Sequence, residues 1–112
     1  MKVTLAYPGI TGKGFDSLGQ GMESGWISHG LALIGAATAQ RGHDVDLVDL
    51  RAPRDWDHFR SEIEARQPDV VGLSMMSVDY NPTMRCLRII RDLDLGILTF
   101  VGGPHPTILT DE

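Results

Sequence analysis

The chain alternates short apolar runs with stretches of helical periodicity from one end to the other. The apolar runs predict strands at 3–7, 45–48, 70–73 and 97–101. The segments between them carry apolar residues at helical spacing and predict helices at about 27–41, 55–67 and 81–93. Strands and helices that alternate in this way build a parallel sheet with right-handed crossovers and helices on both faces. The pattern therefore predicts an α/β domain of three layers, αβα.

The polarity of each strand predicts its place in the sheet. The strand at 45–48 alternates with aspartates, as an edge strand does, whereas the uninterrupted run at 70–73 is typical of a central strand. The run at 97–101 predicts a fourth buried strand. We predict the strand order 2-1-3-4 of a flavodoxin-like or Rossmann-like sheet. Because nothing up to Glu112 covers the outer edge of the fourth strand, we expect a fifth strand outside this sequence, and the chain to be a truncated part of a longer protein.

Glycine, asparagine and proline mark the ends of the predicted helices. Arg41-Gly42 predicts the end of the first helix, with a basic last turn followed by a glycine. Asn81-Pro82 predicts an N-cap and a proline at the first position of the third helix. Cys86 lies on the apolar stripe of that helix, so we predict that it belongs to the core.

Charge and cysteine content exclude several classes of protein. The 112 residues carry a net charge of −5 and no basic patch, which argues against a nucleic-acid partner. No run approaches the roughly 18 apolar residues of a membrane span, and the N-terminus is too short and strand-like for a signal peptide. The single cysteine excludes an internal disulfide and a cysteine-held metal cluster. We therefore expect a cytoplasmic protein without a membrane or nucleic-acid partner, and we assign no catalytic or metal-ligating residue.

Polar residues and glycines follow two strands that we expect to be neighbours. In a parallel sheet, ligands bind beyond the carboxyl ends of the strands. Residues 74–77 leave the strand at 70–73 with two serine hydroxyls, and Gly102-Gly103 leaves the next strand without side chains, so that a ligand can lie against the backbone. Either feature alone also fits an ordinary strand end or tight turn. Together they favour a ligand site.

The motifs of the chain resemble a known family. Residues 102–107, GGPHPT, resemble the segment of that sequence in cobalamin-binding domains that precede radical S-adenosylmethionine catalytic domains. Residues 30–32 and 42–45 are similar to the family's GLA…GHxV passage from helix to strand, and residues 68–74, PDVVGLS, resemble its PDVVGxS strand. Ser74-x-Met76 and Gly102-Gly103 stand where the wider cobalamin fold has its SxL and GG motifs. The resemblance covers essentially the whole chain.

The resemblance implies a site for cobalamin. The hydroxyl of Ser74 or Ser77 would face the detached dimethylbenzimidazole tail, and Gly102-Gly103 would let the nucleotide loop pass close to the backbone. His105 and Thr107 would border the corrin, and the loop after the first strand would approach the lower face of the ring. The expected cofactor-binding residues are Pro8, Gly9, Ser74, Met75, Met76, Ser77, Gly102, Gly103, Pro104, His105 and Thr107.

The loop after the first strand departs from one pattern of the wider family. Corrinoid proteins of the methionine-synthase type carry a DxHxxG motif there, whose histidine ligates cobalt, but residues 9–25 contain no histidine. Many radical S-adenosylmethionine relatives also lack it, so the departure points toward them. His29 is the nearest substitute, although a histidine at a helix start more commonly makes a local hydrogen bond. Without a protein ligand, the lower axial position goes to water or to packing, which favours the changes of cobalt oxidation state that methyl transfer needs.

The resemblance also implies a catalytic domain outside this sequence. Radical S-adenosylmethionine chemistry needs a CxxxCxxC motif for its [4Fe–4S] cluster, and the chain has one cysteine. We therefore expect this segment to bind cobalamin without turning over substrate. S-adenosylmethionine and the cluster would bind to a downstream radical S-adenosylmethionine domain of the same protein. The expected parent is a methyltransferase, with cyclase and ring-contraction enzymes as relatives of the same kind.

Two other functions stay open from the sequence alone. The glycine-rich stretch at 9–21 would suit a flavodoxin-like module that binds a mononucleotide, although the neighbouring hydroxyls of a phosphate loop are missing. The second is a ligand-free interaction domain of the same fold. A receiver-like version of it is disfavoured, because Tyr7-Pro8 and Ser74 stand where a receiver has its acidic cluster and its phosphoacceptor aspartate.

Overall fold

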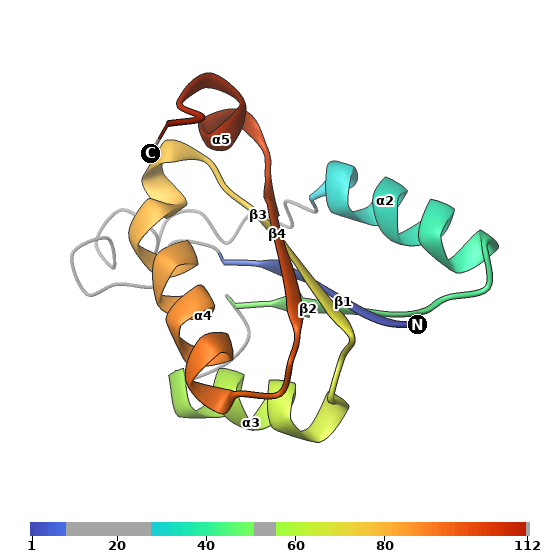
Figure 1. Cartoon of the computed structure of the whole chain (residues 1–112). Coiled ribbons are helices and arrows are strands. Elements are labelled where there is room, and N and C mark those ends of the chain that lie inside the picture. The colour runs from blue at the N-terminus through green and yellow to red at the C-terminus, as the bar shows by residue number, and fades with distance from the viewer. Residues whose placement is uncertain (9–27, 51–55, 112) are drawn as a thin grey trace, which may run out of the picture.

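The computed structural model describes residues 1–8, 28–50 and 56–111 (Figure 1). The strands are β1 (Lys2–Tyr7), β2 (Asp44–Asp49), β3 (Val70–Ser74) and β4 (Leu98–Gly102). The helices are α2 (His29–Gln40), α3 (Trp56–Arg66), α4 (Tyr80–Leu93) and α5 (Pro104–Ile108), with a 3-10 turn, η1 (Ser77–Asp79), before α4. None of the helices in these ranges is long and apolar enough to cross a membrane.

Within the described residues, the strands form one parallel sheet in the order β2-β1-β3-β4. This confirms the predicted order, with β2 at an edge and β3 in the interior. Helices α3 and α4 lie on one face of the sheet and α2 lies on the other (Figure 1). The predicted three-layer α/β arrangement is therefore confirmed.

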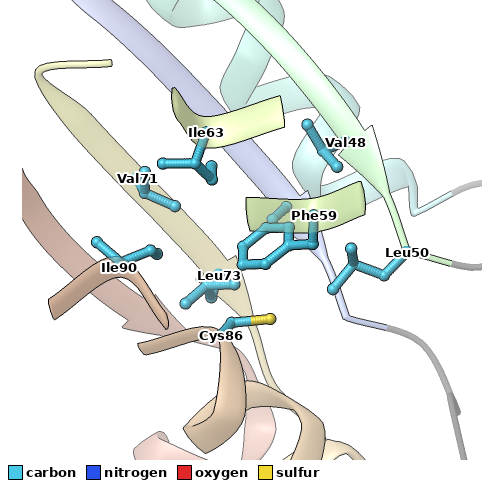
Figure 2. Close-up of a cluster of buried hydrophobic side chains, with 9 residues drawn as sticks. Val48, Leu50, Phe59, Ile63, Val71, Leu73, Cys86 and Ile90 are labelled. Carbon is cyan, nitrogen blue, oxygen red and sulfur yellow. The ribbon is translucent and has the colours of Figure 1, made fainter. Parts of the chain in front are cut away.

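The larger core lies between the sheet and the helices α3 and α4 (Figure 2). Phe59 and Ile63 of α3 and Cys86 of α4 are all 0% exposed there, against Val71 and Leu73 of β3. Cys86 is therefore a core residue, as predicted. Burial raises the pKa of its thiol to about 12, so the thiol stays protonated and packs as an apolar group.

The prediction that the fourth strand is buried was wrong for one of its two faces. Leu98 and Phe100 of β4 are 56% and 58% exposed. They point to the same face of the sheet as Val70 of β3, which packs with Leu31 of α2. Helix α2 packs on β1 and β2, so it does not cover this face of β4. An apolar sequence can predict a strand, but it does not show which face another element covers.

The predicted start of the third helix was also wrong. Helix α4 begins at Tyr80, directly after η1, and its N-cap is Asp79 instead of Asn81. Pro82 is therefore the third helical residue. The first four N–H groups of a helix have no intrahelical partner, so a proline is tolerated there as it is at the first position. The predicted end of α2 is confirmed, since Gly42 follows the C-cap Arg41 with a φ of +86°.

Candidate functional site

The segments that follow β3 and β4 lie side by side at the carboxyl edge of the sheet. Ser74 is the register partner of Gly102, so the last residues of both strands are neighbours. The N–H of Met75 donates to the carbonyl oxygen of Gly102 at 2.8 Å, and the N–H of His105 donates to the carbonyl oxygen of Met75 at 3.2 Å. The structure thus brings together the serine-bearing and glycine-bearing segments that the sequence singled out.

The two glycines of the second segment have different surroundings. Gly103 has a φ of +108°, and a Cβ added to it would lie 2.8 Å from the carbonyl oxygen of Met75 and 3.0 Å from its nitrogen. The contact between the two segments therefore requires glycine at this position. A Cβ added to Gly102 would meet no atom of the described residues within 4 Å. As far as these residues go, the space over Gly102 is open and the fold does not need a glycine there.

Ser74 and Gly102 offer a polar group beside bare backbone. Both lie on the sheet face that carries Gly72 and the exposed ring of Phe100, as the register of β3 and β4 shows. Ser74 is half-buried and Gly102 is exposed. The carboxyl ends of β3 and β4 thus place a serine hydroxyl next to a strand end that carries no side chain.

Side chains tie the turn after β3 to the turn after β4. His105 is 7% exposed, and its Nδ1 lies 3.0 Å from Oγ of Ser77. The imidazole also packs against the ring of Tyr80, with ring centroids 5.4 Å apart and planes tilted by 55°. Thr107 donates its hydroxyl hydrogen to the carbonyl oxygen of Gly103 at 2.7 Å. Pro104 begins α5, where its missing N–H costs nothing.

Asp79 and Thr83 are buried polar residues that the sequence reasoning missed. They are 1% and 0% exposed and lie one helical turn apart. Oδ2 of Asp79 accepts the N–H of Met76 at 3.2 Å, whereas Oδ1 of Asp79 and Oγ1 of Thr83 have no hydrogen-bond partner within the part of the chain that the structure describes. An N-cap aspartate commonly accepts the N–H of the third helical residue, but Pro82 has none. The signal was their spacing, since 79 and 83 continue the buried stripe of Cys86 and Ile90.

Asp79 makes stability depend on pH. Burial raises the pKa of its carboxyl, and the hydrogen bond from Met76 opposes this only in part. Because the folded-state pKa lies above the unfolded value of about 3.9, the contribution of Asp79 is full below that value and is lost as the pH rises through the folded pKa. Asp79→Asn removes the charge that is costly to bury and keeps an oxygen that can accept the N–H of Met76. The substitution should therefore raise the free energy of unfolding at neutral pH. Urea unfolding should show this gain shrinking toward about pH 4; a gain that is equal at every pH would contradict it.

The predicted residues at the end of β1 are described only in part. Pro8 is fully buried, while Gly9 and the glycine-rich stretch of the mononucleotide alternative lie outside the described residues. His29 is exposed at the start of α2, after the N-cap Ser28. In the described ranges, no group of three or more His, Cys, Asp and Glu side chains is placed to hold a metal ion. Contact of the eleven predicted residues with a cofactor stays a prediction.

Comparison with known proteins gives one finding. A family model described as B12 binding domain matches residues 21–112. The match includes β2, β3 and β4 and both segments of the carboxyl edge. No curated protein and no solved structure matches the chain.

Proposed function

The chain belongs to the B12-binding domain family, which binds cobalamin, and from this premise we propose that it is the cofactor domain of a radical S-adenosylmethionine enzyme of the methyltransferase type. The observation that carries the proposal is the open space over Gly102 beside the hydroxyl of Ser74. The GGPHPT and PDVVGLS segments support the radical S-adenosylmethionine partnership through the family resemblance. S-adenosylmethionine and a [4Fe–4S] cluster would bind to the partner domain, because this chain has one cysteine.

Each segment of the carboxyl edge has a role in holding the cofactor. Ser74 would hydrogen-bond the detached base, and Gly102 would let the nucleotide loop lie against the strand end. Bound cobalamin supplies a cobalt centre able to take up and pass on a methyl group. The chain itself would bind and orient the cofactor and would do no chemistry on the substrate. The remaining candidates for contact are Pro8, Gly9, Met75, Met76, Gly103, Pro104 and Thr107, whereas Ser77 and His105 contact each other.

A titration with hydroxocobalamin, followed by visible absorption, tests the proposal. The chain should show a saturable change with the spectrum of a detached base. Gly102→Val should weaken binding at least about tenfold, a loss of about 1.4 kcal/mol, because the valine fills the space that the ligand needs. The variant should still fold, since no atom of the described part of the chain lies within 4 Å of the added Cβ.

Ala39→Val is the matched control. Ala39 is exposed near the end of α2, at the opposite edge of the sheet, so the added apolar bulk should leave binding unchanged. The folded chain showing no saturable change would overturn the cobalamin proposal. Equal affinity of Gly102→Val and wild type would place the ligand elsewhere.

The enzyme partnership has a separate test. It predicts a CxxxCxxC segment in the same polypeptide or in a protein that co-purifies with it, and a [4Fe–4S] spectrum after anaerobic reconstitution. If such a segment is missing from both, the methyltransferase proposal fails while cobalamin binding stands.

A further inference from the structure

We propose that His105 is a positioning residue, which acts through Ser77 to hold the turn after β3 against the turn after β4. In this role His105 does not itself bind the cofactor. It holds the segments that follow Ser74 and Gly102 in the directions that they take away from the sheet, beside the place where the ligand would lie. The inference rests on the proposed cobalamin site, but the contact between the turns is a property of the chain alone.

The burial and partners of His105 support a positioning role. His105 is 7% exposed, so its side chain presents little surface to a ligand. Its Nδ1 lies 3.0 Å from Oγ of Ser77, and the imidazole packs at a tilt against the ring of Tyr80 at the start of α4. Ser77 and Tyr80 both belong to the segment that follows β3, whereas His105 belongs to the segment that follows β4.

The side-chain contact completes a set of backbone contacts between the same two turns. Met75 donates to Gly102, His105 donates to Met75, and Gly103 lets the backbones approach closely. The backbone bonds fix the first residues after each strand. The His105–Ser77 hydrogen bond lies further along both segments, so it fixes the direction in which they leave the sheet. It is also the contact that a side-chain substitution can remove without changing the backbone bonds.

The contact also separates the roles of the two serines. The hydroxyl of Ser77 is engaged with His105. Ser74 lies beside Gly102 in the sheet register, at the open place on the strand ends. We therefore assign the ligand-facing hydroxyl to Ser74 and the positioning hydroxyl to Ser77.

Two substitutions of His105 distinguish positioning from direct contact. In His105→Asn the side-chain amide lies about where Nδ1 of the imidazole was. In His105→Gln the longer side chain places its amide about where Nε2 was. His105→Asn should therefore keep the hydrogen bond to Ser77, and His105→Gln should lose it. We expect His105→Gln and Ser77→Ala each to weaken hydroxocobalamin binding about fivefold, and His105→Asn to stay within about twofold of wild type.

The double variant provides a second readout. If the loss in His105→Gln arises from the broken hydrogen bond to Ser77, then His105→Gln with Ser77→Ala should bind as weakly as either of the two single variants. In the cofactor-free chain, the backbone amides within 75–79 and 103–108 should exchange hydrogen faster in His105→Gln and in Ser77→Ala than in the wild type. In His105→Asn these amides should exchange at the wild-type rate. Circular dichroism checks that each variant is folded.

The possible failures are distinguishable. Additive losses in the double variant, or an equal loss in His105→Asn and His105→Gln, would overturn the positioning role in favour of direct contact with the ligand. Unchanged exchange in His105→Gln and Ser77→Ala would also overturn it. No cobalamin binding by the wild type would instead sink the proposed function, because the exchange measurement on the cofactor-free chain does not depend on the ligand.

Discussion

Phe59→Ala should lower the free energy of unfolding by about 3–5 kcal/mol, because it removes a fully buried ring and leaves a cavity in the larger core. Phe59 is 0% exposed and meets the ring of Trp56 edge to face, with centroids 6.4 Å apart. It lies between α3 and the strands, beside Ile63 (Figure 2). A domain of this size has about 5–15 kcal/mol of stability, so the loss takes a large share of it.

Phe100→Ala is the matched control, because it makes the same change at an exposed site. Phe100 is 58% exposed on the uncovered face of β4, so its loss should change stability by no more than about 0.5 kcal/mol. Urea unfolding followed by far-UV circular dichroism measures both variants without relying on the fluorescence of Trp56. Equal losses at the two positions would mean that Phe100 is covered in solution and would contradict the described sheet face.

Much of the fold could be predicted because it depends on local patterns. The apolar run at 70–73 and the alternating one at 45–48 indicate an interior and an edge strand, and the structure places them so. The exposure of Leu98 and Phe100 could not be predicted, because it depends on which strands α2 covers. The start of α4 was misplaced because η1 supplies the turn before it, and Asn81-Pro82 is equally compatible with the first turn.

The location of the candidate site could be predicted from the sequence, but the roles of its individual residues could not. Parallel strands bring their carboxyl ends to one edge, so Ser74 and Gly102 were expected to be close, and the register confirms this. The different roles of Gly102 and Gly103 do not follow from the sequence. They depend on how closely Met75, in the segment that follows β3, approaches Gly103 after β4. The contact of His105 with Ser77 depends on the same long-range approach.

Gly103→Ala should lower the free energy of unfolding by about 2–4 kcal/mol, through a disfavoured backbone conformation and a steric clash. The φ of +108° lies in a region that residues with a Cβ rarely adopt, and the new Cβ would stand 2.8 Å from the carbonyl oxygen of Met75. That oxygen belongs to backbone held by the bond from His105, so it cannot move aside without breaking the contact between the two turns. Thermal unfolding followed by circular dichroism measures the loss.

Gly102→Ala is the neighbouring control and separates the needs of the fold from those of the ligand. Among residues 1–8, 28–50 and 56–111, no atom lies within 4 Å of its added Cβ, so stability should change by no more than about 0.5 kcal/mol. Its effect should instead appear in hydroxocobalamin affinity, because a methyl group then stands where the cofactor meets the backbone. A stability loss at Gly102 as large as that at Gly103 would show that both glycines serve the turn, and the open place beside Ser74 would no longer point to a ligand. A loss confined to affinity at Gly102 and to stability at Gly103 assigns one glycine to the cofactor and the other to the fold.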